Sequence, residues 1–551
     1  MVLCEIKHSF IMKTSIPRKV CAIFATVSIW SAPAGLWAAD GNWSLEGNGN
    51  WNDPGNWAAG VASGAGFTAT FDATTFSPQT GKVVTLTEDL TIGNITAKIG
   101  ATGTWNIQGS GVLTLSSGGT DQPVINVSGG TDPLRITAVI AGTNGFVKAG
   151  GNRLYLSGAN TFTGGVTIDL GTIWTANAAT LNGNTLTFNG GAWLVAGNNS
   201  NYGNNVILNS NVSFSGSGND DIILSGSISE TGGVRTLGLS TNGGHIRFTL
   251  RGDNAYTGDT NIGLSNNNVG STIIRAEHNN AFGTGTANIS FRGGINKTES
   301  DDSVELAGNI TISNKTLTLR GMGNGDAGSL RSVSGINTWN GNINTGDFGD
   351  ARIGVDADQL IVEGEISGTG ANGLTKVGDG VLVLNGVNTF TNGMVVQAGE
   401  LQAGHNSALA NGSLTLGDGT GIDVLRVKGG VNLGLSSLAL TDSSEFSFDL
   451  TGVYGATGIT VAGDQTGTGT YGVNIFDAGG LTEGIYTLMT VNGTFGATDF
   501  VLNTLPTGYA DSFLEWNNGV LTLNVIPEPS SLLLLGFSSI LAFSRKRSGV
   551  L

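Results

Sequence analysis

The residues that could support catalysis or metal binding are few and widely separated in this sequence. Three histidines follow the first 38 residues and lie far from one another: His245, His278 and His405. Zinc enzymes commonly present two histidines at a short fixed spacing, as in HxxxH or HExxH, and neither pattern occurs. His278 and His405 sit at matching points of two similar segments, AEHNNA and AGHNSA, which is typical of recurrent turn residues. We therefore predict no histidine-based metal site and no cofactor.

Two acidic pairs and two arginines are the other candidates for chemistry. They are Asp220-Asp221, Asp301-Asp302, Arg247 and Arg251. Carboxylates that converge with arginines in one groove could act on a polysaccharide as acid, base or charge stabiliser. Acidic pairs at chain corners are more often simply solvated. We predict that the chain is not an enzyme, with a carbohydrate-active enzyme as the alternative if these side chains converge.

A repeated stretch indicates the elements that would position these residues. Residues 145–173 and 373–401 align without a gap, with twelve of 29 positions identical. A shorter third copy reads LRGDNAYTG over residues 250–258. Self-similarity of this kind is typical of a solenoid. The positions that define the repeat are Gly145, Lys148, Leu154, Leu156, Gly158, Asn160 and Phe162 in one copy, and Gly373, Lys376, Leu382, Leu384, Gly386, Asn388 and Phe390 in the other.

Within the repeat, apolar residues alternate with polar ones over short runs, as at Leu154 and Leu156, which predicts strands with one apolar face. Glycines such as Gly150 and Gly158 bracket the strands where positive φ is expected, and asparagines such as Asn160 also tolerate that conformation. Strands this short cannot bury an apolar face alone, but strands stacked about 4.8 Å apart share one core. We therefore predict an all-β fold, a right-handed parallel β-helix.

The consensus G-L-x-K-x-G-x-G-x-L-x-L-x-G-x-N-T-F/Y-T-G resembles the autotransporter-associated β-strand repeat of large secreted bacterial surface proteins. Residues 373–399 follow it with Asn392 in place of the last glycine, and residues 145–171 depart from it at Phe146 and Asn152. The resemblance covers roughly a tenth of the chain. It implies an exported parallel β-helix and no particular chemical activity.

Composition and charge agree with an exported β-rich chain. The 551 residues include 90 glycines, and charged residues make up only 12%, against about a quarter in typical domains. Both cysteines, Cys4 and Cys21, precede the expected cleavage point, so no disulfide is predicted in the mature chain. The formal charge is −16, and the residues between the two basic ends carry about −22. This acidity argues against nucleic acid and anionic lipid as partners.

The amino end reads as a secretory signal, residues 1–38. Basic residues precede the apolar run 20–30, and small residues follow it, so we predict cleavage after Ala38 or Ala39. A buried amino-terminal helix is the alternative. Residues 39–89 form a tryptophan-rich segment with Trp43, Trp51 and Trp57, which we interpret as a hydrophobic cap on the solenoid end. An aromatic platform for sugar rings is the other interpretation.

Residues 90–442 are predicted to form the β-helix, with about 15 rungs if each takes roughly 20–25 residues. Residues 443–525 are richer in phenylalanine and tyrosine, and within them residues 484–525 read as several antiparallel strands. We predict a small carboxy-terminal β cap there.

Residues 526–551 carry a distinct tail. A Pro-Glu-Pro motif is followed by the apolar run 531–543 and a basic triplet; these residues are Pro527, Glu528, Pro529, Arg545, Lys546 and Arg547. The run is shorter than the roughly 20 residues of a settled membrane helix, and the basic end would stay in the cytoplasm. An ordinary carboxy-terminal anchor is one interpretation. The three elements, in this order, resemble the PEP-CTERM sorting signal, which implies an exosortase-type processing enzyme as a partner, transient inner-membrane anchoring and a Gram-negative host.

Together these features predict an exported, non-enzymatic surface or matrix protein with a structural or adhesive role. Extracellular polysaccharide is the candidate ligand, and nucleic acid is not an expected partner. The alternative is a polysaccharide-lyase-like enzyme or a polysaccharide-binding protein, because some proteins with this predicted fold act on acidic glycans.

Overall fold

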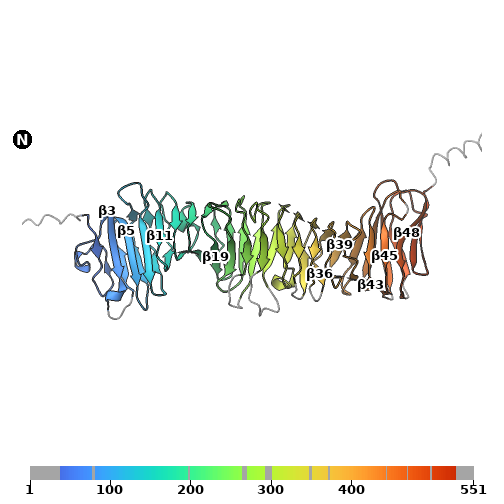
Figure 1. Ribbon diagram of the computed structural model, residues 1–551, viewed down its shortest axis with the longest axis horizontal. Coiled ribbons are helices and arrows are strands. Elements are labelled where there is room, and N and C mark those ends of the chain that lie inside the picture. The colour runs from blue at the N-terminus through green and yellow to red at the C-terminus, as the bar shows by residue number, and fades with distance from the viewer. Residues whose placement is uncertain are drawn as a thin grey trace, which may run out of the picture. The chain divides into compact units, whose positions relative to one another are not determined.

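The structure is a computed structural model that describes residues 38–528, apart from 77–80, 197–198, 264–269, 292–300, 347–349, 370–372, 442, 454, 468 and 497–498. These residues form short strands and four short 3-10 helices, Pro54–Asn56, Ala73–Thr75, Ala178–Leu181 and Asn324–Asp326. The strands stack as a β-solenoid of about 17 turns, and their order along the stack follows the chain (Figure 1). The predicted all-β parallel solenoid is therefore confirmed.

Each turn contributes one strand to each of two or three long parallel sheets. The 14-stranded sheet contains β2 (Gly49–Asn50), β4 (Val83–Leu86), β6 (Trp105–Gly109), β9 (Leu134–Ile136), β12 (Arg153–Leu156), β14 (Thr172–Thr175), β16 (Ala192–Ala196), β19 (Val212–Ser217), β22 (Leu237–Thr241), β24 (Thr260–Ile262), β26 (Asn288–Phe291), β29 (Thr316–Thr318), β32 (Ile343–Asn344) and β35 (Ile366–Ser367). The 12-stranded sheet contains β17 (Asn201–Tyr202), β20 (Asp221–Leu224), β23 (Ile246–Leu250), β25 (Thr272–Ala276), β27 (Ser303–Ala307), β30 (Leu330–Ser334), β33 (Ala351–Val355), β36 (Leu374–Val377), β38 (Met394–Val396), β40 (Ser413–Leu416), β43 (Ser437–Leu440) and β46 (Gln465–Thr466).

Two further sheets close the solenoid on its remaining sides. The 11-stranded sheet, in the first half of the chain, contains β1 (Gly41–Asn42), β3 (Gly64–Asp72), β5 (Leu90–Ile99), β7 (Leu113–Leu115), β8 (Val124–Gly129), β10 (Ile140–Ala141), β11 (Phe146–Ala149), β13 (Val166–Ile168), β15 (Leu186–Phe188), β18 (Val206–Leu208) and β21 (Ile228–Glu230). The nine-stranded sheet, in the second half, contains β28 (Thr311–Ile312), β31 (Ile336–Trp339), β34 (Gln359–Val362), β37 (Val381–Leu384), β39 (Gly399–Ala403), β41 (Asp423–Val427), β44 (Ser444–Leu450), β47 (Thr470–Asp477) and β49 (Asp499–Thr504).

The carboxy-terminal region combines parallel turns with the antiparallel strands predicted within residues 484–525. A five-stranded sheet contains β42 (Asn432–Leu435), β45 (Gly458–Val461), β48 (Gly484–Val491), β50 (Phe513–Asn517) and β51 (Val520–Val525). Only the pairs β48–β51 and β50–β51 are antiparallel, whereas β44, β45, β47, β48 and β49 each make parallel pairs with strands of neighbouring turns. Parallel pairing therefore continues well beyond residue 442, and aromatic residues there, such as Phe446 and Phe448, extend the buried core.

The core is a continuous column of side chains from successive turns. Leu154, Leu156, Leu382 and Leu384 are fully buried, as the alternation of apolar and polar residues predicts. Trp43, Trp51 and Trp57 are also buried, with ring centroids 5.3 Å apart in the pairs 43–57 and 51–57. Their rings cover the apolar interior at the amino-terminal end and offer no open platform for a sugar.

The glycines of the repeat have two different physical roles. Gly150 and Gly171 have φ of 76° and 75°, as the corner argument predicts. Gly158 does not, and it is required for another reason: a Cβ there would lie 2.5 Å from the carbonyl oxygen of Ala138 on the preceding turn. Gly386 has the same relation to the carbonyl oxygen of Gly364, at 2.2 Å. Close approach of consecutive corners therefore selects glycine at this repeat position.

The repeat asparagines act through their side chains, which corrects the prediction that they adopt positive φ. Neither Asn160 nor Asn388 is among the positive-φ residues, although Asn392, which replaces a glycine, has φ of 67°. Asn388 Oδ1 accepts the Ile366 N–H at 2.7 Å, and its Nδ2 donates to the Ala408 carbonyl at 2.6 Å. Each such asparagine therefore joins three turns.

The other two copies contain the same asparagine bridge between turns, which we call the asparagine clamp. Asn160 links Ile140 to Thr180, and Asn254 links Ile228 to Ala281. In all three copies the asparagine Nδ2 donates to a backbone carbonyl of the following turn, and its Oδ1 accepts from a backbone N–H of the preceding turn. The corner backbone is buried at these points, so the clamp satisfies groups that no solvent reaches.

The repeat lysines satisfy corner carbonyls in a similar way. Lys148 is fully buried, and its Nζ donates to the carbonyls of Ala149, Gly150 and Leu170 at 2.9, 2.7 and 2.9 Å. Lys376 is also fully buried, and its Nζ donates to two carbonyls, those of Gly378 and Ala398, each at 2.7 Å. Burial lowers the pKa of both ammonium groups to about 8.

The clamp predicts a specific loss of stability. Asn388→Ala should leave the Ile366 N–H and the Ala408 carbonyl without partners, at a cost of about 1–3 kcal/mol for each unsatisfied group. We expect a lower urea midpoint for this variant by fluorescence. Asn385→Ala is the matched control, because Asn385 makes only an exposed contact with Glu363 Oε1. An equal loss in both variants would contradict the clamp.

The buried lysines predict an unusual dependence of stability on pH. Burial also lowers the pKa of Lys315 to about 8, against 10.5 for the ordinary side chain. Between pH 8 and 10.5 the unfolded chain therefore binds more protons than the folded chain, so the free energy of unfolding should rise with pH, by roughly 1 kcal/mol per pH unit for each lysine that titrates fully.

Urea denaturation of the wild-type chain between pH 7.5 and 9.5 measures this rise. The window stops short of pH 10, where the raised pKa values of Tyr202 and Tyr256 contribute with the opposite sign. In Lys376→Met the rise should be smaller than in the wild type. A flat or falling profile in the wild type would rule out lowered pKa values for these lysines.

Candidate functional site

Parallel pairing in the 12-stranded sheet brings several of the predicted acidic and basic residues to one place. Asp221 of β20 pairs directly with Arg247 of β23, and Arg247 pairs with Ile273 of β25. These three line a depression of about 740 Å³ on the outside of the sheet. The other lining residues are Asn199, Asn219, Asp220, His245, Asp301, Asn324 and Gly325.

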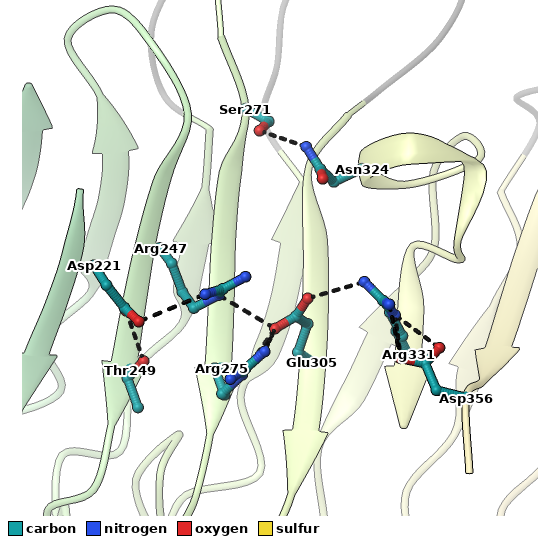
Figure 2. A network of polar contacts seen from close by, with 9 residues as sticks. All are labelled: Asp221, Arg247, Thr249, Ser271, Arg275, Glu305, Asn324, Arg331 and Asp356. Atoms are coloured by element: carbon teal, nitrogen blue, oxygen red, sulfur yellow. Dashed lines mark hydrogen bonds and ion pairs between the residues drawn. The ribbon is translucent and has the colours of Figure 1, made fainter. Parts of the chain in front are cut away.

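The floor of this depression joins a ladder of arginines and carboxylates that runs from Asp221 on β20 to Asp356, just after β33 (Figure 2). Arg247 Nη1 lies 3.5 Å from Asp221 Oδ2, and its Nε lies 3.4 Å from Glu305 Oε2. Arg275 donates to the same Glu305 oxygen from Nη2 at 2.6 Å. The Asp221–Arg247 and Arg275–Glu305 contacts join neighbouring turns of one sheet face, whereas the Arg247–Glu305 contact spans the intervening strand β25.

Glu305 is the centre of the ladder and the most buried charged group in it. Its side chain is 1% exposed, whereas the side chains of Arg247, Arg275 and Arg331 are 32%, 22% and 28% exposed. Three guanidinium groups around one buried carboxylate compensate the loss of its hydration. Arg331 continues the ladder to Asp356, with Nη2 2.7 Å from Oδ2, and the hydrogen bond with Asp356 raises the pKa of Arg331.

The rim of the depression is held by neutral hydrogen bonds. His245 Nδ1 lies 2.8 Å from Ser271 Oγ, and Asn324 Nδ2 donates to the same oxygen at 3.0 Å, as Figure 2 shows for Asn324. Asn219 Oδ1 accepts a hydrogen bond from the backbone N–H of His245 at 2.9 Å. His245 is therefore fixed beside the carboxylates of the depression.

Two of the predicted candidates lie elsewhere. Arg251 pairs with Glu277, with Nε 2.6 Å from Oε2, and that hydrogen bond raises the pKa of Arg251. Asp302 is 2% exposed, and its Oδ1 accepts the buried Thr272 N–H at 2.7 Å. Glu305, Arg275 and Arg331 were not among the candidates from the sequence. The alternation in residues 303–307, SVELA, places Glu305 on the outward face of its strand, but the sequence does not show which residues of neighbouring turns lie beside it.

The lining of the depression offers both hydrogen-bond donors and acceptors, which suits hydroxyl groups. Carboxylate and amide oxygens accept, while the guanidinium of Arg247 and the amide of Asn324 donate. Among the residues the structure describes, no group of three or more histidine, cysteine or acidic side chains is arranged to hold a metal. His278 and His405 stabilise local turns: in each, Nδ1 accepts a hydrogen bond from the backbone N–H two residues later, that of Asn280 or Ser407.

The predicted processing sites fall at the ends of the described region. Ala38 is exposed, and Ala39 exchanges two backbone hydrogen bonds with Ser63. Pro527 and Glu528 are exposed, and the Glu528 N–H donates to the Gly508 carbonyl at 2.8 Å. Pro529, Arg545, Lys546 and Arg547 lie outside the described residues, as does the apolar run 531–543. Within the described part of the chain we find no helix long and apolar enough to cross a membrane.

Comparison with known proteins points to surface proteins with related repeats. The Passenger-associated-transport-repeat model matches residues 146–174, 247–263 and 374–403, which correspond to the three copies described above. The adhesin BmaC autotransporter of Brucella suis biovar 1 (strain 1330) is 29% identical over 434 residues, or 73% of this chain. The chain spans 12% of the length of that relative. No solved structure gives a significant match. The chain thus carries three copies of a passenger-associated repeat on a β-solenoid that is similar to part of an autotransporter adhesin.

Proposed function

We propose that this chain is an exported, non-enzymatic β-solenoid that acts on the cell surface or in the extracellular matrix as an adhesive and spacing element. The observation that carries the proposal is the similarity to the Brucella adhesin over 73% of the chain. The adhesin is much longer than this chain, so its adhesive role comes to these residues as part of the proposal.

The structure supports a mechanical role by the way its polar groups are used. The repeat asparagines and lysines bind backbone groups of neighbouring turns, and the arginines of the 12-stranded sheet bind carboxylates. These contacts hold successive turns together. A repetitive solenoid of this kind offers an extended surface in which each turn contacts only its neighbours.

We further propose that the tail directs sorting. Pro527 and Glu528 are exposed at the carboxy-terminal end of the solenoid, where a processing enzyme could reach them. The basic triplet after the apolar run would hold the chain transiently in the inner membrane, and an exosortase-type enzyme would then release it to the surface.

Fractionation of the native host, with the tail intact or with Pro527–Pro529 replaced by alanines, tests this route. We expect the wild-type chain in surface and medium fractions and the variant retained with the inner membrane. The matched control replaces Asn517 and Asn518, which lie in the β50–β51 hairpin upstream of the motif. An unchanged distribution of the tail variant would contradict sorting by this motif.

The depression on the 12-stranded sheet favours a second candidate function, a carbohydrate-active enzyme. Asp220, Asp221 and Asp301 line it together with Arg247 and His245, which is the convergence that such an enzyme requires. Carboxylates around a groove can serve as general acid and base in glycoside cleavage. Against this candidate, Arg247 is committed to ion pairs with Asp221 and Glu305.

A reducing-end assay on acidic and neutral polysaccharides distinguishes the two candidates. We expect no new reducing ends or unsaturated products from the purified chain over a day. Asp220→Asn and Asp301→Asn variants should then leave every measured property of the chain unchanged. Cleavage by the wild type that both variants abolish would replace the adhesive proposal with the enzymatic one.

A further inference from the structure

The 14-stranded sheet differs in charge from the rest of the chain. None of its strands contains an aspartate or glutamate, although the chain has 41 acidic residues. Its only charged strand residues are Arg135 on β9 and Arg153 on β12. Each of the other four sheets contains at least one acidic strand residue. An overall acidic protein therefore presents one long face whose strands bear only positive charge.

The two arginines lie beside the aromatic residues on the outside of this sheet. Register places Arg135, Tyr155 and Trp174 directly opposite one another on β9, β12 and β14. The Arg135 Cζ atom lies 4.6 Å from the Tyr155 ring centroid and 5.4 Å from that of Trp174. All three side chains are partly exposed. Arg153 stands two residues before Tyr155 on the same outward face. We call these four residues the arginine–aromatic platform.

The platform has hydrogen-bond donors without protein acceptors. Arg135 makes no ion pair or hydrogen bond with any described residue, and Arg153 uses only Nη2, which donates to the Thr131 carbonyl at 2.5 Å. The indole Nε1 of Trp174 is enclosed and has no partner. Arginines elsewhere on the solenoid are used differently: Arg275, Arg331 and Arg426 are each paired with carboxylates.

These features specify the chemistry of a ligand. A guanidinium group with free N–H donors can bind an anion, and a planar carboxylate fits the guanidinium fork with two parallel hydrogen bonds. The partly exposed rings of Tyr155 and Trp174 meet edge to face with centroids 4.8 Å apart, and either can pack against an apolar surface such as the C–H face of a pyranose. Neighbouring strands are about 4.8 Å apart, a length similar to one sugar ring, so consecutive sugars would meet consecutive strands.

We propose that the arginine–aromatic platform binds an acidic polysaccharide through its uronic acid units, with carboxylates on Arg135 and Arg153 and sugar rings against Tyr155 and Trp174. The inference deepens the proposed adhesive function and rests on it for its biological setting. Its test uses the purified chain, so a failure to bind glycan leaves the sorting experiment unaffected.

The acidity of the whole chain is compatible with this local site. At physiological ionic strength charges are screened beyond about 8 Å, so the ligand responds to the nearby arginines more than to distant carboxylates. Double-stranded nucleic acid and anionic membranes are extended polyanions that would also meet the acidic faces of the solenoid. A single chain of a uronate polymer can stay on the acid-free sheet.

The experiment is a titration of the mature chain with polygalacturonate oligosaccharides, followed by calorimetry at 0.05 and 0.15 M salt, with dextran oligosaccharides in parallel. We expect binding of polygalacturonate that weakens with salt, and no binding of dextran. Arg135→Ala and Trp174→Ala should each weaken the affinity roughly tenfold. Arg135→Lys should recover only part of it, because an ammonium cannot form the two parallel bonds.

Phe476→Ala is the matched control. Phe476 stacks with Arg426, whose Cζ lies 4.4 Å from its ring, but that contact is on the nine-stranded sheet beside Asp449. This variant should bind as the wild type does. Thermal unfolding of each variant identifies any loss of folding, and Arg153→Ala replaces a variant that fails to fold.

Three results would overturn the proposal: no binding by the wild type, equal binding of dextran, or an equal loss in Phe476→Ala. Binding of phosphatidylglycerol vesicles in place of the oligosaccharides would assign the platform to membranes and would overturn it as well.

Discussion

The solenoid depends on satisfying the backbone at its corners, where consecutive turns approach too closely for water to enter. Within the strands, parallel ladders pair N–H and carbonyl groups without help from side chains. At the corners the ladder stops, and the repeat residues complete it. The Asn388 side chain forms hydrogen bonds with the turns before and after its own, and Lys376 Nζ donates to two backbone carbonyls. Gly386, which lacks a Cβ, allows the backbones of two consecutive corners to approach closely. The apolar column can form only because these polar groups are satisfied.

This constraint explains which parts of the fold could be predicted from the sequence. Alternation at Leu154 and Leu382 reports the inward face directly, so the parallel solenoid follows from the repeat. The role of Asn160 does not, because a positive φ and a side-chain clamp select the same residue type. The antiparallel pattern predicted for residues 484–525 is present in β48, β50 and β51. The parallel pairs of β48 with β45 and of β49 with β47 were not predicted, since a short alternating strand reads the same whether its partner runs parallel or antiparallel.

The candidate site was less predictable, for a geometric reason. The sequence singles out Asp220, Asp221, Asp301 and Arg247, but their convergence depends on the length of each turn. Partners in the ladder are 26 residues apart from Asp221 to Arg247, 30 from Arg275 to Glu305 and 25 from Arg331 to Asp356. Variable corners shift the alignment of one turn on the next, so no fixed period identifies facing residues. Arg135, Tyr155 and Trp174 are 20 and 19 residues apart, so their spacing is nearly regular, but Arg135 and Trp174 lie outside the aligned repeat positions used in the sequence analysis.

The two sheet faces that carry arginines show that ion pairing with carboxylates determines whether a guanidinium group remains available to bind an external anion. On the 12-stranded sheet Glu305 is nearly inaccessible, and binding it costs its three arginines much of their capacity for other anions. On the 14-stranded sheet no strand offers a carboxylate, so Arg135 rests on aromatic rings and keeps its donors. A guanidinium over a ring retains its charge and loses little flexibility when an anion arrives. The distribution of acidic residues among the sheets, more than the number of arginines, therefore determines where this solenoid can hold an anionic polymer.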